Sequence, residues 1–175
     1  MERTIKKRPF YGAEVQEESA YEAPHRAVSK KAAAEGIVLL KNNRHTLPLA
    51  RGSKVALYGA GATHMVKGGT GSGDVNEREV VTIYQGLLDA GYTVTSKDWI
   101  DAYDRIYKDA RVAWRDDIMK RTKEDVSAGN LAFFMVYSTT PFFTPDGPDV
   151  TKTDADAAIY VLSRVAGEGA DRFNK

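Results

Sequence analysis

The chain has 175 residues, of which 42% are apolar, so it is long enough to bury a hydrophobic core and short enough to form one domain. Its 25 lysines and arginines are balanced by 24 aspartates and glutamates, which excludes the strong positive field of a protein that binds nucleic acid or an anionic membrane. The absence of cysteine excludes disulfides and thiolate chemistry, and three scattered histidines do not suit a metal centre. We therefore expect carboxylate or hydroxyl chemistry on a neutral ligand, without a metal or cofactor.

The N-terminal segment is polar and shows no sustained hydrophobic period. Its charged start is not followed by an apolar run, so it predicts neither a signal peptide nor a membrane-spanning helix. On this basis we expect a cytoplasmic location. We interpret residues 1–23 as an N-terminal arm and residues 24–175 as the folded domain.

Helical patterns alternate with short apolar runs along the rest of the chain. Helix formers after Pro24 predict a helix over residues 24–35 that runs on toward Ile37–Leu40. Apolar residues at helical spacing predict a second helix over residues 80–88, ended by Gly91, and a long amphipathic helix over residues 99–126 with Asp98 as its N-cap. Short apolar or β-branched runs predict strands at residues 54–58, 92–95, 131–137 and 157–162. This alternation predicts an α/β fold with a mainly parallel sheet, whose functional residues lie at the carboxyl ends of the strands.

A glycine-containing turn, Gly59-Ala-Gly-Ala-Thr-His64, follows the first predicted strand and is the first candidate for a ligand site. A dinucleotide-binding turn would need a third glycine where His64 stands, an earlier helix, and an acidic residue about 20 residues further on. We interpret it as a plain turn from strand to loop.

A second glycine-rich loop, Gly68-Gly-Thr-Gly-Ser-Gly73, could bring its backbone and two hydroxyls close to a ligand. Asp74 follows it, where a phosphate-binding loop would carry lysine. The residues alone leave a flexible surface loop and a ligand cradle equally open.

The third candidate is Glu168, which stands between two glycines after the last predicted strand. Such neighbours contribute no packing, but they suit a carboxyl group that is presented on a mobile loop. Arg164, Asp171 and Arg172 are close enough in sequence to tune its proton affinity or to fix the loop. The residues alone do not separate this role from a solvated turn closed by an Asp–Arg pair.

Several segments together resemble the second domain of glycoside hydrolase family 3, in order and in spacing. The segments are Ala34–Asn42 with Leu47–Leu49, Lys54–Gly59, Gly68–Gly73, and Ile159–Arg172. The resemblance implies a flavodoxin-like αβ-sandwich that is incomplete here, because later strands of the family's domain do not follow. The family's nucleophile motif is Ser-Asp-Trp, but Ser96-Lys-Asp98-Trp99 has an extra lysine and is not that motif.

The resemblance also implies an activity, that of a retaining exo-acting β-glycosidase of the β-glucosidase type. Glu168 would be its general acid/base, acting on a β-linked oligosaccharide or glycoside. Ser72 would line the glycone subsite, and Gly69, Thr70 and Gly71 would shape that loop. The nucleophilic aspartate would lie on a separate (β/α)8 barrel domain, which makes this chain half of an active site, inactive alone.

Two other functions stay open from the sequence: a non-catalytic carbohydrate-binding or assembly module, and a flavodoxin-like nucleotide binder. If Met1 is the natural start, the sandwich precedes the barrel. The open sheet edge of an incomplete sandwich also predicts homo-oligomerisation or strand exchange.

Overall fold

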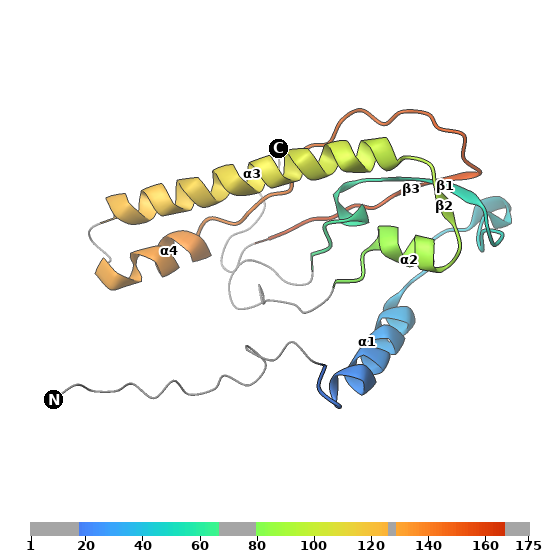
Figure 1. Ribbon diagram of the computed structural model, residues 1–175, viewed down its shortest axis with the longest axis horizontal. Helices are drawn as coiled ribbons and strands as arrows, with labels where there is room; N and C mark the ends of the chain where they lie inside the picture. The colour runs from blue at the N-terminus through green and yellow to red at the C-terminus, as the bar shows by residue number, and fades with distance from the viewer. Residues whose placement is uncertain (1–17, 67–79, 126–128, 167–175) are drawn as a thin grey trace. The chain divides into compact units, whose positions relative to one another are not determined.

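The computed structural model describes residues 18–66, 80–125 and 129–166 (Figure 1). The chain divides into two compact units, Met1–Pro48 and Leu49–Lys175. In the first unit, helix α1 spans Glu22–Gly36 and buries none of its residues. It ends at Gly36 instead of continuing toward Leu40, and the four apolar residues after the glycine are exposed, from 60% at Leu39 to 92% at Leu40.

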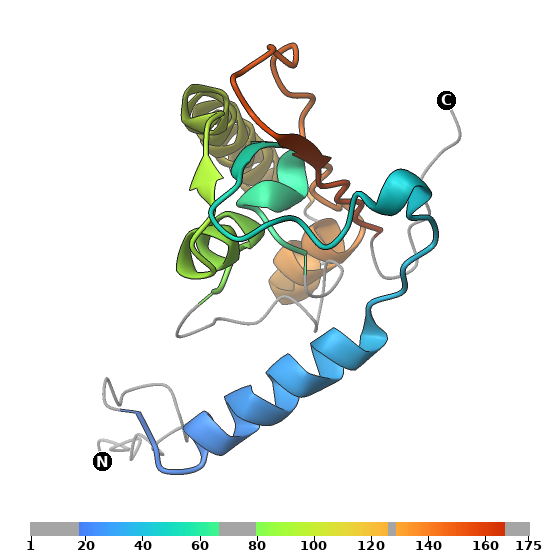
Figure 2. The same ribbon diagram turned by 90° about the vertical axis from the view of Figure 1, so that its right-hand side faces the viewer.

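The second unit is built on a parallel three-stranded sheet in the order β2-β1-β3. Strand β1 spans Lys54–Tyr58, β2 spans Thr93–Val94 and β3 spans Ala157–Tyr160. Helix α2, Ile83–Asp89, connects β1 to β2, and the long helix α3, Lys97–Glu124, follows β2. The connection from β1 to β2 runs across the sheet in one direction, and the connection from β2 to β3 runs in the opposite direction. Because both crossovers are expected to be right-handed, their helices lie on opposite faces of the sheet, with α2 on one face and α3 on the other (Figures 1 and 2).

This arrangement confirms the predicted α/β class. The order 2-1-3 is also that of the first three strands of a flavodoxin-like sheet. The core lies between β1 and the first turns of α3, where the side chains of Leu57 and Tyr103 are at most 2% exposed. The cluster of buried side chains consists of Ala56, Leu57, Tyr58, Ala62, Trp99, Ile100 and Tyr103.

Strand β2 is too short to pair with the whole of β1, and beyond its end the side chain of Ser96 forms hydrogen bonds with the backbone of β1. The ladder continues through the hydrogen bond from the Thr95 N–H to the Val55 carbonyl, at 2.9 Å. The Ser96 hydroxyl then accepts from the Leu57 N–H and donates to the Leu57 carbonyl, both at 2.7 Å. Ser96 is also the residue before α3, so one buried side chain joins the central strand to the start of the longest helix.

The irregular segment of residues 141–156, which we call the strap, runs from the end of α4 to β3 (orange to red in Figure 1). Aromatic side chains from α3 and β1 donate hydrogen bonds to its backbone carbonyls. The pairs are Tyr103 Oη with Pro145 at 3.1 Å, Trp99 Nε1 with Pro148 at 3.0 Å, and Tyr58 Oη with Thr151. Strap carbonyls that have no partner in the sheet are thereby satisfied.

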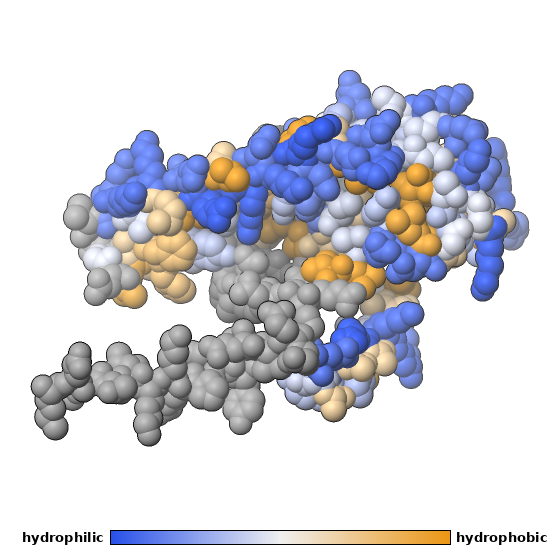
Figure 3. Space-filling view, in the orientation of Figure 1, coloured by the Kyte–Doolittle hydropathy of each residue, from blue (hydrophilic) through white to orange (hydrophobic). Residues whose placement is uncertain are grey.

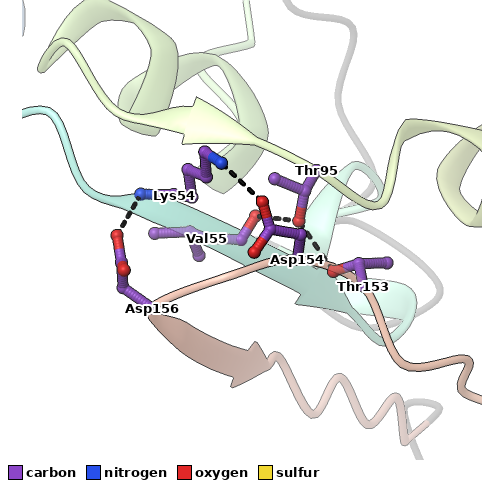
Figure 4. Close-up of polar contacts among 6 residues, drawn as sticks. All are labelled: Lys54, Val55, Thr95, Thr153, Asp154 and Asp156. Carbon is purple, nitrogen blue, oxygen red and sulfur yellow. Dashed lines mark hydrogen bonds and ion pairs between the residues drawn. The ribbon is translucent and has the colours of Figure 1, made fainter.

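The last residues of the strap are fixed to the start of β1 by polar contacts (Figure 4). The Lys54 ammonium forms an ion pair with Asp154 at 2.5 Å, and the Lys54 backbone N–H donates to Asp156 at 2.9 Å. The hydroxyls of Thr95 and Thr153 are hydrogen-bonded at 2.7 Å. These contacts fix the point at which the chain enters β3 and therefore the register of β3 on β1.

The predicted strand at residues 131–137 is wrong, because this segment forms helix α4, Ala132–Ser138, after a short 3-10 turn. Ala132 and Val136, one helical turn apart, are its buried residues, and Tyr137 packs edge-on against Trp114 of α3. A short continuous apolar run fits either a strand or a helix, and here the long face of α3 favours a helix. Apolar side chains remain exposed over α4, below the hydrophilic surface of α3 (Figure 3).

The predicted N-cap of the long helix is also wrong. Ser96 occupies the N-cap position, and Asp98 lies in the first turn, where a carboxylate interacts favourably with the helix dipole. Among the described residues there is no helix that combines the length and the apolar character needed to span a bilayer.

Candidate functional site

The candidate site lies where β1 and β3 end side by side. β1 is the central strand, and the chain that leaves it leads to β2 on one side, whereas β3 pairs with β1 on the other side. The carboxyl ends of β1 and β3 are therefore the point at which the strand order reverses. In open parallel sheets, ligands bind outside the carboxyl ends of the strands at such a switch point. Residues 59–66 after β1 and residues 161–166 after β3 form this edge.

Two glycines allow the chain leaving β1 to pass close to the end of β3. Gly59 has a φ of 90°, and a Cβ there would clash with the backbone oxygen of Val161. A Cβ on Gly61 would lie 2.6 Å from Val161 Cγ1. The Gly61 N–H donates to the Val161 carbonyl at 3.2 Å, which locks the contact. The glycines therefore serve the packing of the two strand ends against each other.

The chain leaving this turn is fixed to α3 through Asp104. Its Oδ1 atom accepts from the Thr63 hydroxyl at 3.0 Å and lies 2.8 Å from His64 Nε2, while the His64 ring stacks on Tyr107 at 3.6 Å. Burial lowers the pKa of His64 below its ordinary value of 6.5; Asp104 opposes this effect, and Lys108 adds to it. The neutral imidazole thus donates to the carboxylate and holds the exit from β1 against the helix.

A pocket of about 180 Å³ opens between the strap and the end of β3. Trp99 and Tyr103 form its inner wall, with their rings stacked 3° from parallel and their centroids 5.3 Å apart. Gly147 lies against this wall so closely that a Cβ there would be 2.8 Å from the Trp99 ring. Burial raises the pKa of Tyr103 to about 12, so this phenol stays protonated as a donor. The lining residues are Gly59, Ala60, Trp99, Tyr103, residues 144–147 and residues 160–164.

Arg164 is the one sequence-predicted site residue within the described ranges. It is exposed and lines the pocket. The other predicted site residues lie outside the described residues: Glu168, Ser72, Thr70, Gly69, Gly71, Asp171 and Arg172. The described chain nevertheless brings the residues that lead into both predicted loops, 59–66 and 161–166, to one edge of the sheet.

Sequence reasoning missed the pocket. The sequence predicts only that Trp99 and Tyr103 lie in the long helix of residues 99–126, and it predicts no regular element around Gly147. The Gly-Pro pair at residues 147 and 148 was the available signal, since a glycine suits a close approach of backbone to a ring. Nothing in the local pattern shows which ring it approaches.

Comparison with known proteins gives consistent relatives. Residues 37–175 match the model of the glycosyl hydrolase family 3 C-terminal domain. The chain is 34% identical over 148 residues to β-glucosidase A of Butyrivibrio fibrisolvens, covering 85% of this chain and 16% of that protein. It is 29% identical to β-glucosidase 3B of Thermotoga neapolitana, solved in complex with α-D-glucose (TM-score 0.53) and with glucose (TM-score 0.54), covering 86% of this chain and 19% of that one. The chain therefore spans less than a fifth of the length of these relatives.

Proposed function

The chain belongs to the glycosyl hydrolase family 3 C-terminal domain family, and from this premise we propose that it is part of a retaining, exo-acting β-glycosidase of the β-glucosidase type. Its substrate is a terminal β-linked sugar, and this chain supplies the general acid/base. The observation that carries the proposal is the family match over residues 37–175, which includes both loops that the sequence singled out. The shared sheet edge from which the chain enters these loops supports it.

In the proposed mechanism, Glu168 protonates the oxygen of the leaving group. Retaining glycosidases use two carboxyl groups about 5–5.5 Å apart, one as nucleophile and one as acid and then base. The nucleophile would come from a barrel domain joined to this one, in line with the small share of the relatives that this chain spans. Ser72 would contact the glycone, with Gly69, Thr70 and Gly71 shaping its loop. Arg164, Asp171 and Arg172 would support the acid.

An acid at this position needs a pKa raised toward the working pH, because it must carry a proton when substrate binds. Burial against a barrel domain and a bound sugar would raise it by removing water from the carboxyl group. We therefore expect the assembled enzyme, and not this chain alone, to hydrolyse glycosides.

The test is Glu168→Ala in the full-length enzyme. Hydrolysis of cellobiose, which has a poor leaving group, should slow by about 10²- to 10⁴-fold, since the proton donor is lost. Turnover of an activated aryl β-glucoside should recover in azide, which attacks the glycosyl-enzyme directly without a base and is released as the glycosyl azide. The matched control is Glu124→Ala at the exposed end of α3, which should leave both rates unchanged. An unchanged cellobiose rate for E168A would remove Glu168 from the mechanism and leave a carbohydrate-binding or assembly module.

A further inference from the structure

The pocket between the strap and β3 combines an aromatic surface with groups that form hydrogen bonds. Tyr160, a residue that is 60% exposed, contributes an aromatic ring, and Asp146 and Arg164 contribute one carboxylate and one guanidinium. Thr144 and Ser163 add hydroxyls. The negative charge of Asp146 is balanced by the positive charge of Arg164, so a ligand in the pocket has both hydrogen-bond acceptors and hydrogen-bond donors within its lining. This lining suits a neutral polyhydroxylated molecule better than a phosphate or an apolar one.

We propose that this pocket binds one sugar unit and, resting on the proposed function, that it is the subsite for the leaving-group sugar. The C–H face of a pyranose ring packs on an aromatic ring such as that of Tyr160. Its hydroxyls donate to the Asp146 carboxylate and accept from the Arg164 guanidinium, and such charge-assisted hydrogen bonds are the stronger kind.

The size of the pocket selects a single ring. Its volume of about 180 Å³ is below the roughly 300–1,000 Å³ of pockets that hold drug-sized ligands. Its opening to solvent leaves room for a glycosidic bond to continue outward. A monosaccharide unit fills it, whereas a longer oligosaccharide extends beyond it.

The pocket wall is fixed before any ligand binds. Trp99 and Tyr103 are 7% and 2% exposed, and each donates to a strap carbonyl. The strap therefore does not have to be ordered by the sugar, which removes part of the entropic cost of binding. Tyr160 is the last residue of β3, Arg164 follows four residues later, and both line the pocket.

The position along the chain indicates which sugar unit binds. Arg164 precedes Glu168 by four residues, so the pocket adjoins the start of the acid/base loop. A general acid protonates the oxygen that departs with the leaving group, and the departing unit must therefore lie on the side of that acid. The glycone remains with the loop of Ser72 and the barrel domain.

Binding is tested on the 175-residue chain with glucose and methyl β-D-glucopyranoside as probes. The amide NMR signals of Gly147, Ser163 and Arg164 should shift with millimolar sugar. Asp146→Ala should weaken binding by about tenfold or more, since it removes a charged hydrogen-bond partner. Asp149→Ala, an exposed aspartate outside the pocket on the same strap, is the matched control and should bind like the wild type. Absence of shifts at the pocket, or equal affinity of D146A and D149A, would overturn the proposal.

The assignment to the leaving-group side is tested by kinetics in the full-length enzyme. Asp146→Ala and Tyr160→Ala should lower kcat/KM for cellobiose by about tenfold and barely change it for an aryl β-glucoside, whose leaving group makes no sugar contacts. Equal losses on both substrates would place the sugar elsewhere and refute the assignment. Glu168→Ala separates the acid/base role of Glu168 from sugar binding in the pocket. If E168A loses turnover while added sugar still shifts the NMR signals of the pocket residues, both claims are supported. Unchanged turnover of E168A with pocket binding intact would refute the acid/base role and retain only a sugar site.

Discussion

Replacing Ser96 by alanine should be among the most destabilising single changes in this unit. Ser96 is 3% exposed, and its hydroxyl serves both the N–H and the carbonyl of Leu57, at 2.7 Å each. Strand β2 has ended by this point, so alanine leaves two buried backbone groups without partners. Each such group costs about 1–3 kcal/mol, which gives a total loss of about 2–6 kcal/mol. For a chain of this size, at about 3 °C per kcal/mol, that corresponds to a Tm lower by roughly 6–18 °C.

The measurement is urea denaturation of the chain, with Ser53→Ala as the control. Ser53 also donates to a backbone carbonyl, that of Ala50 at 2.8 Å, but it does so where water can replace it. S53A should cost no more than about 0.5–1 kcal/mol. Ser96→Thr keeps the hydroxyl and should recover part of the stability. If S96A and S53A unfold at the same urea concentration, or if the Leu57 amide exchanges equally slowly in both, Ser96 does not replace the missing strand.

Three further predictions concern the same unit. Gly59→Ala places a Cβ against the backbone of Val161 at a positive φ and should lower the free energy of unfolding by about 2 kcal/mol or more. Gly86→Ala, in helix α2 with open space around it, should raise the free energy of unfolding by about 0.5–1 kcal/mol. Equal thermal melting temperatures of the two variants would contradict this prediction. Burial lowers the pKa of His64 in the folded chain, so below about pH 6.5 the unfolded chain binds more protons than the folded chain. The free energy of unfolding should therefore be highest above pH 6.5 and should decrease as the pH falls toward the folded-state pKa. This decrease should be seen in the wild type and be smaller in H64Q. Asp156→Ala removes the partner of the first N–H of β1 and should cost about 1 kcal/mol, while Asp154→Ala breaks only an exposed ion pair and should leave the urea midpoint unchanged; a larger effect of D154A would reverse this ranking.

The sequence predicts the central strand and the long helix well, because their patterns depend on burial alone. Residues 54–58 form β1 as expected, and the long helix spans Lys97–Glu124 against the predicted 99–126. It fails at residues 131–137, where an apolar run without alternation has no period that separates strand from helix. The tertiary environment determines the structure of this segment. Helix α3 extends beyond the sheet, and the segment packs on α3 as a helix that buries Ala132 and Val136.

The candidate site divides in the same way. Residue type singles out the loop of residues 68–73 and Glu168, because a presented carboxyl and a close backbone approach leave local signals, but both lie outside the described residues and stay predictions. The pocket could not be found in this way, since Trp99, Gly147 and Tyr160 come from three elements that only the crossovers bring together. Ser96 escaped for a related reason: a serine before a helix indicates a cap, and nothing in the sequence shows that β2 stops short.

The carbonyls that hold the strap come from Pro145, Pro148 and Thr151, so they recur at every third residue. A chain of the polyproline type turns once in three residues, so carbonyls at this spacing would share one side of such a chain. Because the donors contact backbone oxygens, side-chain changes at residues 145, 148 and 151 should disturb these three hydrogen bonds less than a change in the length of the strap. Inserting one residue rotates the following carbonyls away from their rings, whereas inserting three restores the phase. Among related chains, strap lengths should therefore differ in steps of a whole turn.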